Sequence, residues 1–192
     1  MFFALTLGYL LGSIPFGLIL TRLAGKGDIR QVGSGNIGAT NVLRTGSKLL
    51  AALTLILDCL KAVVAIVLVQ LLFGRETGAF AATGALVGHL YPAWLRFRGG
   101  KGAATLFGIL MALLWPAAIV YAVIWIFLLL TIRISSVAGM AAALSAPIAA
   151  VLLRSSLFPM LLGFAVLVLW KHRENILRLR RGTEPRIGRA KA

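Results

Sequence analysis

The chain has 192 residues, of which 60% are hydrophobic, and its mean hydropathy is +0.96. Roughly half of the residues of a soluble domain are apolar, so this composition excludes an ordinary soluble protein and predicts one integral membrane domain over residues 1–192. The 20 Lys and Arg against five Asp and Glu give a net charge of +15. Membrane orientation explains part of this excess, and we expect no nucleic-acid partner. The only cysteine, Cys59, excludes a disulfide within the chain and a cysteine-based metal site.

Three apolar segments come first in the chain and predict membrane helices at about 2–23, 48–73 and 78–95. The first segment has no basic residue before it and several after it, opposite to a secretory signal peptide, so we expect a retained helix. The second carries Asp58 and Lys61, which are three residues apart and therefore share a helix face. Two hypotheses stay open for this pair: a structural ion pair facing the bundle, and a role in a functional site.

Two longer apolar stretches follow, at 103–131 and 137–170. As single helices they would be about 43 and 51 Å long, whereas the hydrocarbon core of a membrane is about 30 Å thick. Breaks at 115–116 (Trp-Pro) and at 154–156 with Pro159 predict that each stretch forms two helices. The expected fold is therefore all-α with seven transmembrane helices. Five helices would place the charges equally well, but segment length favours seven.

The basic residues predict that the N-terminus lies outside and the C-terminus in the cytoplasm. In this arrangement 17 of the 20 Lys and Arg fall on the cytoplasmic side, Lys61 lies within a helix, and only Arg75 and Arg154 lie outside. This asymmetry follows the positive-inside rule. Splitting only one of the two long stretches would place the basic tail outside, so we exclude that arrangement.

A first polar island, "VGSGNIGATNVLR", occupies residues 32–44 between two apolar segments. Its glycines allow positive φ and close backbone approach, so successive N–H groups can form an anion-binding concavity. Its polar side chains add hydrogen-bond donors, and the forked guanidinium of Arg44 suits phosphate oxygens. The expected ligand contacts, besides Gly33, come from Ser34, Gly35, Asn36, Gly38, Thr40, Asn41 and Arg44. An ordinary interfacial turn is the alternative, which the lack of any acid over 29–57 disfavours.

A second island, "GHLYPAWLRFRGGKGAAT", spans residues 88–105. Lys101 precedes a predicted helix, and a lysine at the positive end of a helix is unfavourable unless an anion lies there too. We therefore expect Gly100 and Lys101 to bind a phosphate group, with anchoring to anionic lipid headgroups as the alternative. His89 could serve as a base or a ligand, although a structural role is the favoured interpretation.

A third island, "WKHRENILRLRRGTEPR", spans residues 170–186. His172 and Asn175 are three residues apart and share a face if the last helix continues, and Arg173 or Arg178 could join them. We interpret the basic tail beyond them as a segment that binds lipid headgroups and orients the chain.

The sequence lacks several catalytic patterns: paired carboxylates, a metal-binding cluster, a G-x-S-x-G elbow, an Asp-rich motif and a His-x4-Asp pair. We therefore expect a site without metal or other cofactor that binds more than one anion through hydrogen-bond donors and cations. The predicted topology places all three islands on the cytoplasmic face, next to lipid. This setting suits a reaction that joins a water-soluble phosphate compound to an acyl chain.

The motifs "GSGNIGATNVLR", "GHLYPAWLRFRGGKGAAT" and "HRENILRLRRGTEPR", in this order, resemble those of the bacterial acyl-phosphate:glycerol-3-phosphate acyltransferases, the PlsY family. The resemblance covers essentially the whole chain. It implies transfer of a fatty acyl group from acyl-phosphate to the 1-hydroxyl of glycerol 3-phosphate, which gives lysophosphatidic acid and phosphate and begins phospholipid synthesis. It also implies a seven-helix protein of the bacterial inner membrane with its site facing the cytoplasm.

Acyl-phosphate is an activated mixed anhydride, so we expect direct attack by the glycerol hydroxyl, with the donor's own phosphate taking the proton. Ser34 and Asn36 would hold the reacting groups together with backbone amides, and His172 completes the expected catalytic set. A covalent role for Ser34 would need a base within reach, which only His172 or His89 could supply. A membrane transporter of a small organic phosphate is the alternative function. Polar islands on one face and no internal repeat argue against it.

Overall fold

The computed structural model describes residues 1–188, which form helices and connecting loops without a β-strand. Residues 189–192, including the Arg189 and Lys191 counted in the charge argument, lie outside the described part. The chain divides into two compact units, Met1–Leu113 and the part from Leu114 onward. Each unit has its own set of packed helices.

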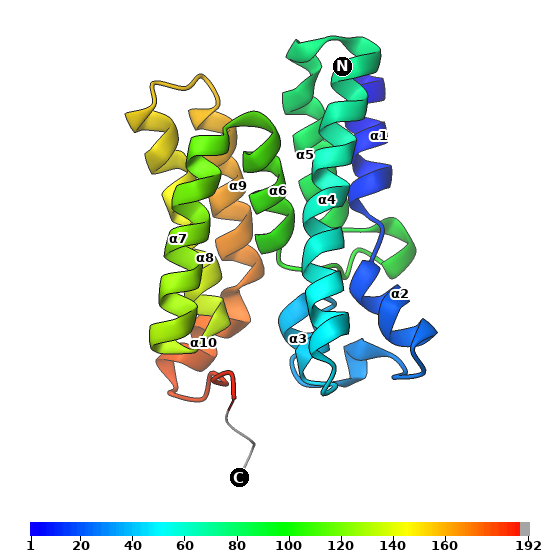
Figure 1. Cartoon of the computed structure of the whole chain (residues 1–192), viewed down its shortest axis with the longest axis vertical. Coiled ribbons are helices and arrows are strands. Elements are labelled where there is room, and N and C mark those ends of the chain that lie inside the picture. The colour runs from blue at the N-terminus through cyan, green and yellow to red at the C-terminus, as the bar shows by residue number, and fades with distance from the viewer. Residues whose placement is uncertain (189–192) are drawn as a thin grey trace. The chain divides into compact units, whose positions relative to one another are not determined.

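The first unit contains six α-helices and three short 3-10 turns. The helices are α1 (Phe2–Gly12), α2 (Phe16–Leu23), α3 (Ala39–Leu43), α4 (Lys48–Phe73), α5 (Gly78–Leu90) and α6 (Ala103–Leu113), and the turns are η1 (Ile29–Gln31), η2 (Arg75–Thr77) and η3 (Ala93–Leu95). Helix α4 contacts α1, α5 and α6, and α1 packs along α5 (Figure 1). The long α4 is therefore the central element of this unit.

Glycines allow α1 and α5 to lie backbone to backbone. A Cβ added to Gly8 or Gly12 would come within 2.3 or 2.2 Å of a carbonyl oxygen of α5. From the other side, a Cβ on Gly84 or Gly88 would come within 2.2 or 2.3 Å of a carbonyl oxygen of α1. Small residues four apart on both helices are the usual means of close packing in membranes, where helices gain no hydrophobic energy from leaving lipid.

Proline determines two helix ends in this unit that the sequence-based boundaries miss. The predicted helix 2–23 is interrupted between α1 and α2, because Pro15 has no N–H to donate. The predicted helix 78–95 is wrong at its end: α5 stops at Leu90, because Pro92 disfavours helical geometry in the residue before it. Both interruptions lie in the first unit next to polar residues of the second island.

The short α5 brings the second island deep into this unit. Helix α4 has 26 residues and α5 has 13, so they are about 39 and 20 Å long. Only η2 joins them, so α5 runs back along α4 and reaches about its middle, where Lys61 of α4 contacts His89 in the last turn of α5. The chain then turns into α6 at this level, as Figure 1 shows. The glycine turn of the second island lies deeper than a loop at the membrane face.

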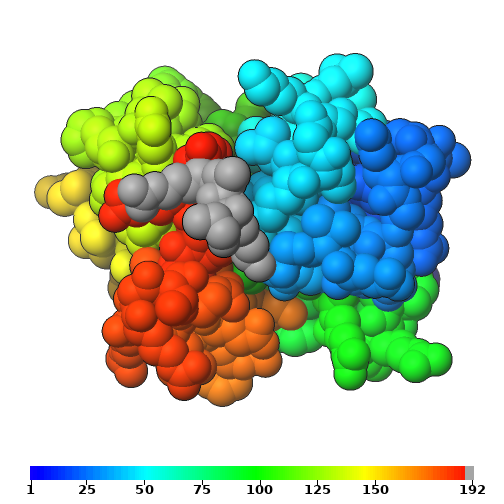
Figure 2. All heavy atoms as spheres, turned by 90° about the horizontal axis from the view of Figure 1, so that it is seen from below, coloured from blue at the N-terminus to red at the C-terminus, as the bar shows by residue number. Residues whose placement is uncertain are grey.

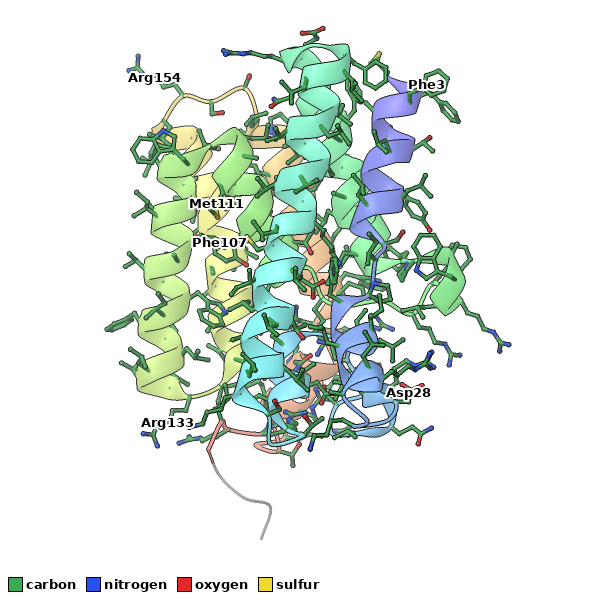
Figure 3. All side chains as sticks on the ribbon, turned by 45° about the vertical axis from the view of Figure 1, so that its right-hand side comes forward. Phe3, Asp28, Phe107, Met111, Arg133 and Arg154 are labelled. Atoms are coloured by element: carbon green, nitrogen blue, oxygen red, sulfur yellow. The ribbon has the colours of Figure 1, made fainter. Side chains whose placement is uncertain are left out.

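The second unit contains α7 (Trp115–Ile132), α8 (Ser135–Leu152), α9 (Phe158–Lys171) and α10 (Arg173–Arg180). Helix α8 packs against both α7 and α9 through a face that is rich in buried alanine. Arg133 and Arg154 follow α7 and α8 and lie at opposite ends of this unit (Figure 3). Their separation matches the opposite sides of the membrane that the charge pattern predicts for them.

The structure confirms that both long apolar stretches are split. Helix α6 ends at Leu113 and α7 starts at Trp115 with a proline in its first turn, and α8 ends at Leu152 before α9 starts at Phe158. Four helical segments are long and apolar enough to cross a membrane: Phe2–Leu23, Lys48–Phe73, Trp115–Ile132 and Ser135–Leu152. The remaining apolar helices are shorter, so the count of seven spans and the orientation of the termini stay predictions.

Candidate active site

A buried asparagine organises the loop of the first island. Asn41 is 1% exposed, and its Nδ2 donates to the carbonyl oxygens of Ile29 at 2.9 Å, Val32 at 2.8 Å and Asn36 at 2.8 Å. These three carbonyls lie along the stretch that leads from η1 to α3. Asn41 therefore holds the loop in one shape, and its predicted contact with substrate stays a prediction.

The side-chain oxygen of Asn41 brings Ser34 and Arg44 together. This Oδ1 accepts from the Ser34 backbone N–H at 3.1 Å, from Ser34 Oγ at 3.4 Å and from Arg44 Nη1 at 3.2 Å. Gly33 (φ 58°) and Gly35 (φ 68°) flank the serine, so the backbone has the left-handed turns expected of an anion-binding loop. Ser34 and Arg44 are both exposed. The structure thus brings a hydroxyl and a guanidinium together in one glycine-containing loop, in which the Gly35 N–H donates to Val32 O at 3.0 Å.

The other predicted residues of this island form the entry to α3. Gly38 precedes α3 with a φ of −83°, so the expectation of positive φ at this glycine is wrong. A Cβ on Gly38 would lie 3.3 Å from Asn36 Nδ2, which places the amide of Asn36 against the backbone there. Thr40 is half-buried in the first turn of α3. Figure 2 shows α2, the following loop and α3 as a continuous surface at this end of the first unit.

Asp28, the carboxylate that precedes this loop in the chain, is paired with two arginines. Asp28 accepts hydrogen bonds from Arg30 Nε at 2.9 Å and from Arg22 Nη2 at 3.1 Å. The Arg30 guanidinium beside it holds the pKa of Asp28 well below its usual range. Asp28 lies at the end of the unit opposite Phe3 (Figure 3). Its charge is therefore offset, and the loop of residues 32–44 keeps a positive balance.

The glycine turn of the second island is tied to the last turn of α5. The Gly99 N–H donates to Leu90 O at 3.3 Å, and the Gly100 N–H donates to His89 O at 3.0 Å. A Cβ on Gly99 would lie 2.1 Å from His89 O, so a larger residue would not fit. Lys101 follows, and α6 begins two residues later. The predicted position of Lys101 at a helix N-terminus is confirmed.

Hydrogen bonds to α1 fix the rest of the second island. Tyr9 Oη donates to Tyr91 O and accepts from the Ala93 N–H, both at 2.9 Å, and Trp94 Nε1 donates to Ser13 O at 2.8 Å. Ser13 lies where α1 is interrupted, so the interruption supplies an acceptor for the tryptophan. The sequence did not predict these contacts, because it did not predict the helix break at residues 13–15 that exposes the Ser13 carbonyl.

A shared core joins the first two islands. Leu18 of α2, Ile37 of the first island and Val42 of α3 are buried together, and Leu95 of the second island packs against them. Both islands therefore pack together within the first unit. The expectation that all three islands lie on the cytoplasmic face and serve one site stays a prediction.

The third island lies in the second unit, where His172 caps α10. His172 Nδ1 is 2.8 Å from Val168 O. Since a carbonyl oxygen only accepts, Nδ1 carries the hydrogen and Nε2 is the basic nitrogen of the ring. Asn175 lies in the first turn of α10 and is buried like His172. The structure thus places both predicted residues at one helix start.

Glu184 organises this island and was not among the predicted residues. Its Oε1 accepts from Ser136 Oγ at 2.6 Å and from Asn175 Nδ2 at 2.5 Å, and its Oε2 accepts from Arg178 Nε at 2.7 Å. Burial, the largest single contribution, raises the pKa of Glu184, but the three hydrogen bonds together lower it below its usual value. The clue in the sequence is an acid among the arginines of the tail, in the turn "GTEP".

The predicted site residues are divided between the two units. The first unit holds those from Ser34 to Lys101, and the second holds His172 and Asn175. That all of them act on the same substrates stays a prediction. Within residues 1–188 no group of three or more His, Cys, Asp or Glu side chains lies close enough to hold a metal ion.

Comparison with known proteins extends over nearly the whole chain. The glycerol-3-phosphate acyltransferase family model matches residues 2–182. Similar proteins with that name include one from Rhodopseudomonas palustris (strain BisB5), 53% identical over 98% of this chain and 96% of that protein. Another is from Brucella anthropi, 55% identical over 96% of this chain and 92% of that protein.

Solved structures of an integral membrane glycerol 3-phosphate acyltransferase, PlsY, are also similar to this chain. The glycerol 3-phosphate form has a TM-score of 0.91 and is 36% identical over 97% of this chain and 95% of that chain. The lysophosphatidic acid form has a TM-score of 0.88 at 34% identity, with the same coverage. Family model, relatives and structures therefore agree that the chain belongs to the glycerol-3-phosphate acyltransferase family, as an integral membrane acyltransferase of the PlsY type.

Proposed function

We propose that this protein transfers a fatty acyl group from acyl-phosphate to the 1-hydroxyl of glycerol 3-phosphate. The products are lysophosphatidic acid and inorganic phosphate, at the first step of phospholipid synthesis, with the site facing the cytoplasm of a bacterial inner membrane. The observation that carries this proposal is the loop around Asn41, which holds Ser34 and Arg44 beside two left-handed glycines.

Two phosphate-binding sets support a reaction between two phosphate compounds. Arg44 offers a planar fork with several N–H donors, which suits phosphate oxygens, and it lies over Gly33, whose added Cβ would be 2.7 Å from Arg44 Cδ. Lys101 offers a second positive charge at the start of α6, next to the buried Gly100. Glycerol 3-phosphate and acyl-phosphate would each find one cation, Arg44 or Lys101.

The proposed reaction is a direct displacement. The 1-hydroxyl oxygen of glycerol 3-phosphate attacks the acyl carbonyl carbon, the bond from that carbon to the phosphate oxygen breaks, and the departing phosphate takes the hydroxyl proton. The Ser34 hydroxyl, turned from its long 3.4 Å contact with Asn41 Oδ1, and the Asn36 amide would hold the carbonyl and phosphate oxygens. One such donor to a developing oxyanion contributes about 3–4 kcal/mol in other enzymes. The basic Nε2 of His172 would accept from the attacking hydroxyl and orient it.

The surroundings of Ser34 support a positioning role over a covalent one. Its hydroxyl lies 3.4 Å from Asn41 Oδ1, and an amide oxygen accepts a hydrogen bond without removing the proton. Acyl-phosphate is already activated, so an acyl-serine intermediate would add a step without lowering the main barrier.

Synthesis of lysophosphatidic acid by the purified protein in detergent tests this function. Acyl-phosphate and glycerol 3-phosphate alone should give stoichiometric lysophosphatidic acid and phosphate. Absence of product with acyl-phosphate, combined with product from an acyl thioester, would overturn the proposed donor. Absence of product with either donor would overturn the proposed reaction, and an organic-phosphate transporter would give this result.

A further inference from the structure

Three buried ionisable side chains meet in the middle of the first unit. Lys61 Nζ lies 2.7 Å from Asp58 Oδ1, 2.8 Å from Ile14 O and 2.9 Å from His89 Nδ1. Asp58, Lys61 and His89 are 3%, 5% and 4% exposed. Charges buried to this extent are costly unless each is paired and hydrogen-bonded, so this arrangement calls for an explanation.

The lysine joins three separate elements of the unit. Asp58 belongs to α4 and His89 to the last turn of α5, and the Ile14 carbonyl lies in the interruption between α1 and α2. The interruption at Pro15 leaves carbonyl oxygens without ordinary helical partners, and Lys61 satisfies one of them. A purely structural role explains the contact to Ile14, but it does not require a histidine as the third partner.

The contacts of Lys61 determine which nitrogen of His89 carries the hydrogen. An ammonium group has three hydrogens and no lone pair, and Lys61 has three neighbours at hydrogen-bonding distance. It therefore donates to all three, and His89 Nδ1 must accept. The hydrogen of the neutral ring is then on Nε2, the reverse of the assignment for His172.

The Nε2 edge of His89 faces the glycine turn of the second island. A Cβ added to Gly100 would lie 2.1 Å from His89 Nε2 and 2.6 Å from Cε1, so the ring rests against the Gly100 backbone. The Gly100 N–H also donates to His89 O at 3.0 Å. Lys101 is the next residue. The imidazole thus supports the turn that carries a cation at the start of α6.

We propose that Asp58 and Lys61 are positioning residues for the acyltransfer reaction: they hold His89, with its hydrogen on Nε2, against Gly100 and so fix the Gly100–Lys101 turn for the phosphate of a substrate. This role rests on the function proposed above. The ammonium sets the orientation and tautomer of the ring, and the carboxylate keeps the ammonium in place. The phosphate could be that of glycerol 3-phosphate or that of acyl-phosphate, and the kinetic test distinguishes them.

The tautomers can be observed directly, because the chain contains only two histidines. In the protein labelled with 15N in the histidine rings, His89 should show a protonated Nε2 and a bare Nδ1, and His172 the opposite. A His172→Gln variant assigns the two sets of signals. A hydrogen on Nδ1 of His89, or on both of its nitrogens at neutral pH, would overturn the proposal whether or not the protein makes lysophosphatidic acid.

The kinetic test uses two replacements that separate the ring nitrogens. The amide of His89→Gln can place its N–H donor where Nε2 lies, whereas the shorter His89→Asn reaches only the position of Nδ1. We expect His89→Asn and Lys61→Met to raise KM for one phosphate substrate at least about tenfold, with a smaller change in kcat. His89→Gln should keep KM within about threefold. The substrate whose KM rises is the one whose phosphate the turn binds.

Cys59→Ala is the matched control. Cys59 is a buried residue of α4 beside Asp58, but its Sγ contacts Met111 Sδ at 3.7 Å on α6, away from His89. It should leave both KM values unchanged. Equal KM values for wild type, His89→Gln and His89→Asn would show that the ring nitrogens do not position the turn. If Lys61→Met does not fold, the two His89 variants and the tautomers decide the question.

Discussion

Ser34 and Arg44 both donate to the side-chain oxygen of Asn41. The asparagine and the arginine have different roles in this arrangement. Arg44 is exposed and Asn41 is fully buried, so the arginine can reach a ligand while the asparagine shapes the loop. The sequence pattern predicts the loop and its glycines. It does not separate Asn41 from its polar neighbours, because the direction of an amide depends on backbone turns that composition does not reveal.

Removing either cation of the proposed phosphate sites should mainly impair substrate recognition. Loss of one charge-assisted contact costs about 1.5–3 kcal/mol, so kcat/KM of Arg44→Ala and of Lys101→Ala should fall roughly 10- to 150-fold. Arg44→Lys should recover only part of the loss, because an ammonium lacks the guanidinium fork. Steady-state kinetics with each substrate in turn gives the measurement, and unchanged kinetics in both alanine variants would remove these residues from the site.

Glu184 links stability to pH in the second unit. Its pKa in the folded protein is lowered by hydrogen bonds from Ser136, Asn175 and Arg178, with burial acting in the opposite direction. A lowered pKa stabilises the fold above the unfolded value, about 4.3, and this contribution is lost as the pH falls through the folded pKa. The melting temperature of Glu184→Gln should therefore lie below that of wild type at pH 7, and the gap should narrow below about pH 4. A gap that does not change with pH would contradict this account.

Proline and glycine determine where the elements begin, end and touch. Pro116 and Pro159 mark helix starts that the sequence pattern predicts, because each interrupts an apolar stretch too long for one span. The interruption at Pro15 and the end of α5 before Pro92 are missed. Both were missed because the sequence stays apolar through these positions. A prediction from hydropathy does not detect the backbone hydrogen bond that proline cannot make. The depth of the glycine turn follows from the short α5, so it could not be predicted without that helix end.

Close packing of α1 on α5 predicts an effect of a single methyl group. A Cβ on Gly84 would lie 2.2 Å from Leu5 O and 2.7 Å from Tyr9 N, both backbone atoms, so Gly84→Ala must push the helices apart. We expect a loss of about 2–4 kcal/mol in the free energy of unfolding, seen as a lower melting temperature in detergent. Gly163 of α9 is the control, because an added Cβ there meets nothing within 4 Å. Gly163→Ala should be neutral or slightly stabilising, and equal effects at both positions would contradict the packing argument.

The whole molecule divides its polar residues between two compact units, with the loops of residues 32–44 and 88–105 in one and His172 and Asn175 in the other. Sequence order and the basic-residue asymmetry predict that these islands serve one site. The shared core of Leu18, Ile37, Val42 and Leu95 shows that the first two islands pack together, and service of one site stays a prediction. The role of Glu184 could not be predicted from the sequence. Its partners Ser136 and Arg178 are 48 and six residues away, and the residues around Glu184 do not indicate that the tail folds back to meet them.

At the scale of the complete reaction, direct displacement requires acyl-phosphate and glycerol 3-phosphate to be bound together. We therefore expect sequential kinetics, with intersecting lines in double-reciprocal plots, in place of the parallel lines of a ping-pong enzyme. Incubation with acyl-phosphate alone should give no acylated protein by intact-protein mass spectrometry. Ser34→Ala should keep activity above background, because the Ser34 hydroxyl in the proposed mechanism supplies a hydrogen bond to the substrate and no covalent link. A stoichiometric mass gain of one acyl group, absent in Ser34→Ala, would replace direct attack with a two-step transfer through the serine.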